Sequence, residues 1–187
     1  MKPWQRLLAL GLVVAVLAHL LTAWAAPRLI MREAMARIAK DSTNGVYLPP
    51  PTDHTQRRIV MPSPDLLYAT CAADLSEQPL RISAEVAHPR YWSVALYGAN
   101  SDNFFVVNDR KVASRSADAP SPLELLVIAP GTDRAALSSP PGATIVEAPS
   151  AKVLLLMRLL VTDDGADLAS AERARQSLRC QPAIAAR

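Results

Sequence analysis

An uncharged apolar run of 20 residues, Leu7 to Ala26, follows a short basic N-terminus in this chain. A helix of that length, rising about 1.5 Å per residue, crosses the hydrocarbon core of a bilayer. The small residues around Trp24 also fit signal-peptidase cleavage after Ala25, although the run is longer than most signal sequences. We expect a retained single-pass anchor at residues 1–27, with a cleaved leader as the alternative. The neutral His19 inside the run is expected to be a helix-contact residue.

Residues 28–58 are expected to join the anchor to a folded domain. The segment from Arg28 to Lys40 predicts a helix lying on the membrane surface or on the domain, because its apolar residues recur at helical spacing. Asp41 to Gly45 are breaker residues that end this helix, and Leu48 to Pro51 predict a stiff, extended spacer.

The apolar period changes to two after residue 59, which predicts strands. We expect a mainly β (α+β) fold over residues 59–187, an antiparallel β-sandwich-like domain of about seven strands with a C-terminal helix. The first strands should form an antiparallel meander. The segment Val153–Val161 is apolar on both faces apart from Arg158, which predicts a central strand. The expected strands are Leu66–Ala73, Leu80–Val86, Tyr91–Tyr97, Phe104–Val107, Leu123–Ala129, Ala143–Glu147 and Val153–Val161, and the expected helix is Leu168–Leu178.

The soluble part carries almost no net charge. Without Lys2 and Arg6 the chain has 18 basic and 17 acidic side chains, and its basic pairs have no interleaved aromatic residues. Nucleic acid is therefore not an expected partner.

Motifs for common enzymes are missing from the sequence. It contains no GxSxG, P-loop, GxGxxG or HExxH motif, so we expect no cofactor and no metal. His54 and His88 are expected to be solvated surface side chains. Asp163, Asp164 and Asp167 lack the spacing of a calcium loop, and they predict a turn with Asp167 as the N-cap of the last helix.

The two cysteines, Cys71 and Cys180, lie far apart and form no CxxC motif or Cys/His metal spacing. Behind a membrane leader they predict a structural disulfide, with a pair of buried free thiols as the alternative. Since a disulfide does not persist in the cytosol, the bond would place the domain in an oxidising periplasm. The Lys and Arg residues on the two sides of the apolar run do not decide the orientation.

Five segments together resemble the bacterial domain-of-unknown-function 1254 family: Pro62–Tyr68, Asp74–Ser76, Pro79–Ile82, Tyr91–Tyr97 and Ser101–Phe104. The short, membrane-anchored branch of that family is similar to this chain from leader to terminal cysteine. The resemblance implies a β-rich, sandwich-like fold and supplies no reaction. Larger members carry a second domain of the unknown-function 1214 type, which implies a separate envelope protein of that type as a partner. Where larger members have an aromatic residue in the first strand, this chain has Cys71.

Polar residues at the strand ends are the candidate binding site. In an antiparallel meander the start of the first strand and the ends of the Phe104 strand could meet, beside Tyr97 and Phe105. Such a cluster could bind a small ligand or sugar; alternatively its members cap turns and pair with Arg110. The candidates are Asp65, Tyr68, Tyr91, Asp102, Asn103, Asn108, Asp109 and Arg110.

Two functions remain open from the sequence. The first is a non-enzymatic domain, anchored in the bacterial inner membrane and facing the periplasm, that binds a partner envelope protein or a small envelope ligand. The second is a hydrolase or lyase that uses Asp65, Asp102 or Asp109 as acid or base.

Overall fold

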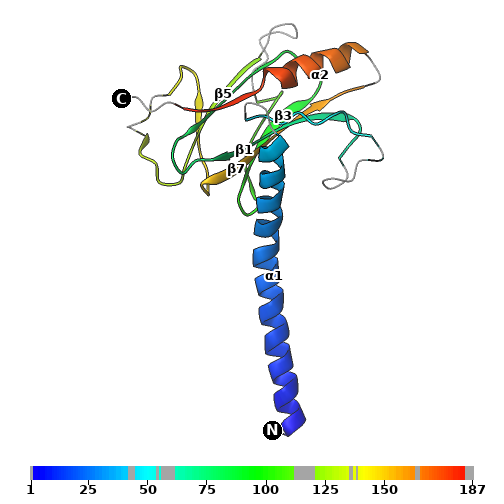
Figure 1. The fold of residues 1–187 in the computed structure, drawn as a ribbon, viewed down its shortest axis with the longest axis vertical. Coiled ribbons are helices and arrows are strands. Elements are labelled where there is room, and N and C mark those ends of the chain that lie inside the picture. The colour runs from blue at the N-terminus through cyan, green and yellow to red at the C-terminus, as the bar shows by residue number, and fades with distance from the viewer. Residues whose placement is uncertain are drawn as a thin grey trace.

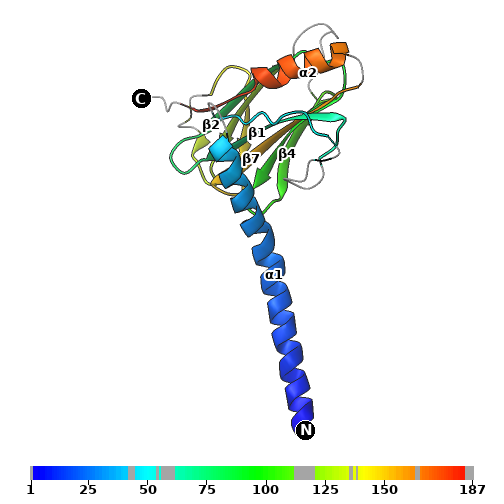
Figure 2. The ribbon, with the colours of Figure 1, turned by 45° about the vertical axis from the view of Figure 1, so that its right-hand side comes forward.

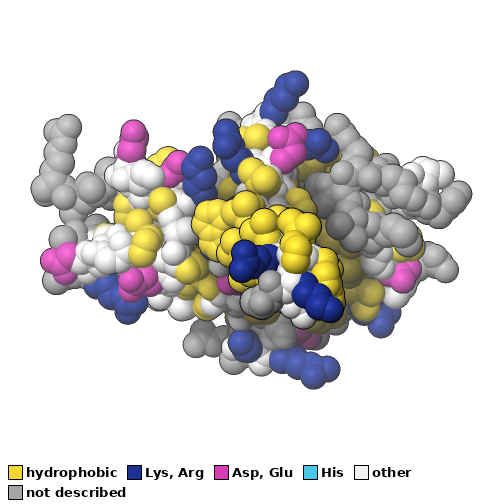
Figure 3. Space-filling model, turned by 90° about the horizontal axis from the view of Figure 1, so that it is seen from below, with side chains coloured by type: hydrophobic (Ala, Val, Ile, Leu, Met, Phe, Trp, Pro, Cys, Tyr) yellow, Lys and Arg dark blue, Asp and Glu magenta, His cyan; other side chains and the backbone are white. Residues whose placement is uncertain are grey.

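A long helix and a domain of two β-sheets make up this chain in the computed structural model, which describes residues 2–41, 45–53, 55, 62–111, 121–134, 137, 139–162 and 165–183 (Figure 1). Helix α1, Pro3–Asp41, has 39 residues, and is therefore about 58 Å long at the usual rise. Residues 2–24 are exposed and, seen from the N-terminal end, mostly hydrophobic (Figure 3). Among the described residues this is the one helix long and apolar enough to cross a membrane, a test that a signal sequence also passes.

The predicted strands all form, with bounds within two residues of the prediction. They are β1 (Leu66–Asp74), β2 (Leu80–Val86), β3 (Trp92–Gly98), β4 (Asn103–Asn108), β5 (Ser121–Ile128), β6 (Thr144–Glu147) and β7 (Lys152–Leu160). Helix α2, Gly165–Ser177, and a short strand β8, Arg179–Pro182, follow. The predicted mainly β fold with a C-terminal helix and an N-terminal apolar helix is confirmed.

Two four-stranded sheets pack face to face, with strand orders β1-β7-β3-β4 and β6-β5-β2-β8. Every pairing is antiparallel except that of β5 with β6. Strand β7 lies between β1 and β3, so the predicted central position of this segment is confirmed. Its alternate residues are buried in the core between the sheets: Val153, Leu155, Met157 and Leu159.

The predicted meander is wrong. Among the first four strands only β3 and β4 are hydrogen-bonded neighbours, because β7 separates β1 from β3 and β2 belongs to the second sheet. The alternation that predicts each strand records which face is buried, and it holds no information about which strand lies beside it.

Helix α1 ends on the domain rather than above it (Figures 1 and 2). The helix continues without interruption through Pro27, the predicted end of the anchor. In its last turns Met31, Met35 and Ile38 are buried, at helical spacing. At the start of this segment the Ser101 hydroxyl, in the turn between β3 and β4, donates to the Pro27 carbonyl at 3.1 Å. The expected helix of residues 28–40 therefore forms and packs on the domain.

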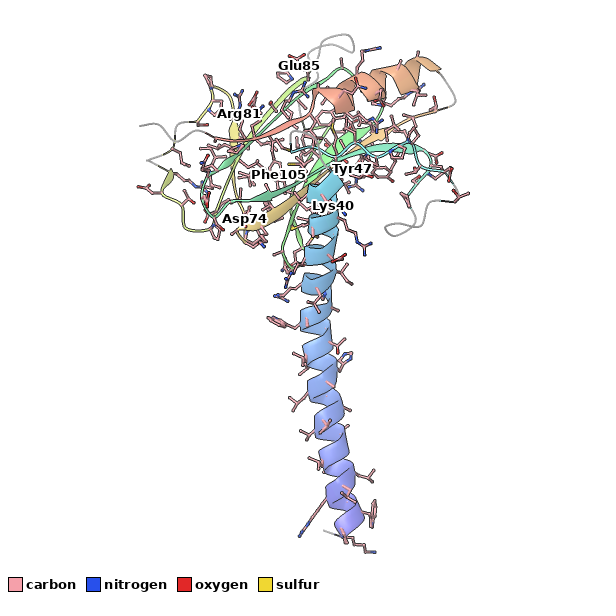
Figure 4. The ribbon with its side chains drawn as sticks, in the orientation of Figure 1. Lys40, Tyr47, Asp74, Arg81, Glu85 and Phe105 are labelled. Atoms are coloured by element: carbon pink, nitrogen blue, oxygen red, sulfur yellow. The ribbon has the colours of Figure 1, made fainter. Side chains whose placement is uncertain are left out.

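The segment after α1 is extended, as predicted, but it packs along the domain instead of standing away from it. Tyr47 and Thr70 exchange two backbone hydrogen bonds of 2.8 and 2.9 Å at the outer edge of β1. Arg175 of α2, which is only 7% exposed, donates to the Pro49 carbonyl at 2.6 Å. Lys40 and Tyr47 mark where the helix end and this segment meet the sheet (Figure 4).

Candidate functional site

One end of the β1-β7-β3-β4 sheet brings together part of the predicted site. Here β1 begins, β7 ends, β3 begins and β4 ends, because Leu66 pairs with Leu160 and Ser93 pairs with Asn108. The predicted residues at this end are Asp65, Tyr91, Asn108, Asp109 and Arg110, with Tyr68 two residues into β1 from its first residue. The Asp65 end of β1 is three strand spacings from the end of β4, or about 14 Å.

Asp102 and Asn103 lie at the opposite end of the sheet, where β4 begins and β3 ends at Gly98. The Asp102 carboxylate accepts a 2.5 Å hydrogen bond from the Asn100 amide, and the Asp102 carbonyl accepts from the Gly98 N–H. Ser101 has a φ of 72° in this turn and contacts α1. These two residues shape a turn beside α1, so the single predicted cluster does not form.

A shallow pocket of about 320 Å³ opens beside Asp65. Pro64, Leu160, Val161 and Thr162 form the rest of its wall. Asp65 is exposed and, among the described residues, is the one carboxylate that lines this pocket. The pocket can therefore receive a small polar group, and no second carboxylate of the described residues lines it to share acid and base roles with Asp65.

His88, next to this end of the sheet, is buried rather than solvated, so that prediction is wrong. Its Nδ1 lies 2.8 Å from the Ser170 hydroxyl in α2, and its Nε2 lies 2.8 Å from the Leu160 carbonyl oxygen. Burial lowers the pKa of His88, against the opposing effects of the Leu160 carbonyl and the Asp167 carboxylate. The imidazole therefore joins the β2–β3 connection, the end of β7 and α2. His54 falls outside the described residues.

Asp167 supports the same junction from the first turn of α2. Its carboxylate accepts from Thr162 Oγ1 at 2.6 Å and from Arg90 Nε at 2.9 Å. The Thr162 hydrogen bond, followed by Arg90, lowers the pKa of this carboxyl, and burial opposes the shift. The prediction that Asp167 is the N-cap is wrong, because the helix begins at Gly165. The turn predicted at Asp163 and Asp164 falls outside the described residues.

A polar row crosses the outer face of the β1-β7-β3-β4 sheet, and of its four members only Tyr68 and Asn108 are among the candidates predicted from the sequence. Arg158 on β7 lies opposite Tyr68 on β1 and opposite Ser93 on β3, which in turn lies opposite Asn108 on β4. Cross-strand partners project from the same face of a sheet. The sequence signal for this row was Arg158 itself, the single charged residue of the otherwise apolar segment Val153–Val161.

Cys71 and Cys180 lie side by side, on β1 of one sheet and β8 of the other. Both are buried free thiols, at 2% and 5% exposure, and no disulfide joins them. The hydrogen bond that the Cys180 thiol donates to the neighbouring Cys71, together with burial, raises the pKa of the Cys180 thiol. They line an open pocket of about 300 Å³ whose wall also includes Gly45, Ala72, Ala73, Pro79, Leu80 and Pro182, with Asp74, Glu77 and Gln78.

Comparisons with known proteins relate this chain to uncharacterised proteins. The model of a family described as "Protein of unknown function (DUF1254)" matches residues 43–182. No curated protein matches the chain. The VPA0106 protein from Vibrio parahaemolyticus is similar in structure, with a TM-score of 0.61 at 13% identity over 86% of this chain and 36% of that chain. A putative uncharacterized protein from Burkholderia cenocepacia has a TM-score of 0.51 at 15% identity, over 87% of this chain and 41% of that one. This chain thus spans well under half the length of either solved relative.

Proposed function

Because the chain belongs to the DUF1254 family of proteins of unknown function, we propose its role from its own geometry: a membrane-anchored periplasmic domain that binds a partner envelope protein or a small envelope ligand. The partner we propose is a separate envelope protein of the unknown-function 1214 type.

The docking of α1 on the domain is the observation that carries this proposal. Met31, Met35 and Ile38 are buried on the domain, and Ser101 bonds to Pro27 one residue beyond the apolar run. The domain therefore has a fixed height above the plane that the apolar run would occupy. A fixed position suits a protein that presents one surface to a partner at the membrane, since little orientational freedom is lost on binding.

The two solved relatives support a protein partner. In each, the fold of this chain is one part of a polypeptide more than twice as long, since 36% and 41% of those chains are covered. The same fold is therefore compatible with packing against further protein. The surface that we propose for the partner is the sheet end with Tyr91 and Arg110, which are both exposed.

Native membranes provide the test. The full-length protein is cross-linked in its own membranes, solubilised in mild detergent and purified, and the stoichiometry of any second protein is measured. We expect one partner at about 1:1 with wild type, lost in a Tyr91→Ala/Arg110→Glu variant and kept in Arg81→Glu, whose side chain lies on the second sheet. Purification of wild type without a stoichiometric partner, or equal recovery from both variants, contradicts the partner role.

The alternative is a hydrolase or lyase, and the geometry favours it less. The pocket at Asp65 is compatible with a small substrate. However, Asp102 lies at the opposite end of the sheet, and Asp109 lies about 14 Å from the Asp65 end by strand spacing. Two carboxylates that divide acid and base roles lie in one cleft, at most about 9.5 Å apart in glycosidases.

We further propose that Cys71 and Cys180 form a disulfide in the cell. Their contact across the two sheets supports this, because the bond requires only loss of two protons and two electrons to a thiol oxidant of the compartment. A thiol with a raised pKa is a poor nucleophile, so the bond would form during folding. Its formation would mean a periplasmic domain, since cytosolic reductants keep thiols reduced.

A further inference from the structure

The outer face of the β1-β7-β3-β4 sheet contains hydrogen-bond donors that have no partner among the described residues. Tyr68, Arg158, Ser93 and Asn108 follow one another across β1, β7, β3 and β4 in direct register. Directly opposed residues have Cβ atoms about 4.5 to 5.5 Å apart on the same face. The Arg158 side chain therefore leaves the sheet between the side chains of Tyr68 and Ser93.

Within the described part of the chain, three buried polar atoms on this face have no hydrogen-bond partner: Arg158 Nε, Ser93 Oγ and Thr70 Oγ1. A fourth such atom, the acceptor Asp109 Oδ1, belongs to the residue that follows Asn108. Ser93 is fully buried, and Thr70, the next outward residue on β1 after Tyr68, is 9% exposed. Buried polar groups are almost always satisfied, and leaving them unpaired costs free energy. Ser93 lies directly opposite Arg158, and Thr70 lies two residues further along β1 from the partner of Arg158. The lack of partners for these atoms among the described residues points to a ligand that bonds to them.

The chemistry of the row selects the kind of ligand. Arg158 donates only, and the Ser93 and Thr70 hydroxyls are free to donate. Among the described residues no ion pair joins Arg158 to a carboxylate, whereas Arg81, Arg90, Arg134 and Arg175 each have one. A water molecule would satisfy a hydroxyl but would leave the positive charge without a counter-charge.

We propose that this row is a binding site for an oxyanion, a carboxylate or phosphate group, in which Arg158 supplies the charge and Ser93 a second hydrogen bond. Arginine suits planar, two-point recognition of such groups. The site specifies the small-ligand part of the proposed function and rests on it. It does not depend on a protein partner.

The melting temperature of the full-length protein in nonionic detergent is the readout, measured in sodium phosphate, sodium acetate and sodium chloride at equal ionic strength. A ligand at ten times its Kd should raise the melting temperature by about 3 °C, in a saturable way that chloride does not reproduce. We expect this shift in wild type and in the control Arg81→Met. Arg81 lies on a strand of the other sheet, away from helix α1 (Figure 4). Arg158→Met should abolish the shift and Ser93→Ala should reduce it.

Nanodiscs distinguish a free anion from a lipid head group. If the head group of an anionic lipid is the natural occupant, phosphatidylglycerol discs should stabilise wild type but not Arg158→Met, and added phosphate should then have no further effect. If the occupant is a free anion, phosphate should act equally in phosphatidylglycerol and phosphatidylcholine discs. Either result supports the site.

The absence of any anion-specific shift, or an equal shift in Arg158→Met and Arg81→Met, overturns the proposal. Should Arg158→Met fail to fold, Arg158→Lys, which keeps the charge and loses the two-point geometry, makes the same comparison together with Ser93→Ala. A wild type that retains its protein partner but shows no effect of phosphate or acetate in detergent, and none of phosphatidylglycerol in nanodiscs, rejects this site and leaves the partner role intact.

Discussion

At the scale of the residue, buried polar side chains differ in whether they have hydrogen-bond partners. His88 is 7% exposed, yet both ring nitrogens have a partner at 2.8 Å, and the neighbouring Asp167 bonds to Arg90 and Thr162. Satisfied groups of this kind stabilise one arrangement of the elements that they join. By contrast, the row around Arg158, on the outer face of the β1-β7-β3-β4 sheet, contains buried polar atoms without a partner among the described residues.

His88 should make the stability of the domain depend on pH. Its pKa is lowered in the folded state, chiefly by burial, so the unfolded chain binds the proton more readily between the folded pKa and about 6.5. The stability that the neutral ring contributes is complete above about pH 7 and is lost as the pH falls through this interval. We expect the melting temperature of wild type to fall on acidification from about pH 7 to 5, and His88→Gln to lack this slope.

The lowered pKa of Asp167 acts in a separate interval. Its contribution is present above about pH 4 and is lost only as the pH falls further towards the folded pKa. A melting-temperature series in steps of half a pH unit therefore separates the two groups. Equal slopes for wild type and His88→Gln between pH 7 and 5, or a wild type that gains stability on acidification, would show that His88 is not held neutral in this junction.

At the scale of the element, the sequence predicts the strands well and their neighbours poorly. The segment Leu80–Val86 forms as predicted because alternation is a local property. The pairing of β1 with β7 is set by contacts between residues about 90 positions apart, which no local pattern records. Strand β8 has four residues, ends at Pro182 and pairs with β2, so it had no periodic signal.

The same reason limits prediction of the candidate site. Asp65 and Asp109 share a sheet end, but Asp102 does not, because Asp102 precedes β4 and Asp109 follows it. The strands β7 and β3 separate β1 from β4, so Asp65 and Asp109 are also not neighbours. Arg158 was visible in the sequence as a charge in an apolar strand, whereas its relation to Ser93 depends on the register of β3 against β7. The sequence therefore shows that a charged residue is unusual at this position, but it does not show which side chains lie beside that residue in the sheet.

The docked part of α1 is the element whose contribution is most easily measured. Replacing Met35, which is 8% exposed, by Asp buries a carboxylate and should weaken docking by about 2 kcal/mol or more. Since each 1.4 kcal/mol is a factor of ten in the open population, trypsin should cleave after Arg32 and Arg37 on the order of tenfold faster or more, when opening is rapid relative to cleavage. The measurement is the rate of tryptic cleavage of the full-length protein in nanodiscs, followed by mass spectrometry.

Ala36→Asp is the matched control, because the adjacent Ala36 is exposed on the same turn of α1. It introduces the same charge and should leave the cleavage rate within about twofold of wild type. If Met35→Asp and Ala36→Asp are cleaved equally, then the helix end is not held by its apolar face.

At the scale of the whole molecule, helix α1, the extended segment and the sandwich form one connected unit. The extended segment bonds to β1 at Tyr47 and to α2 through Arg175. The family match, residues 43–182, includes this segment. Cys71 and Cys180 lie across the two sheets near the same edge. A disulfide here would close a loop of about 110 residues and stabilise the fold by ~4–5 kcal/mol through the unfolded state.

The oxidation state of these two cysteines in living cells tests the proposed location most directly. Cells are quenched in acid, and the denatured full-length protein is treated with a maleimide mass tag before and after reduction. A periplasmic domain predicts no tag on wild type before reduction and two tags after it, whereas Cys71→Ser takes one tag before reduction. Two tags on wild type before any reductant would contradict the account, because both thiols would then be free in the cell.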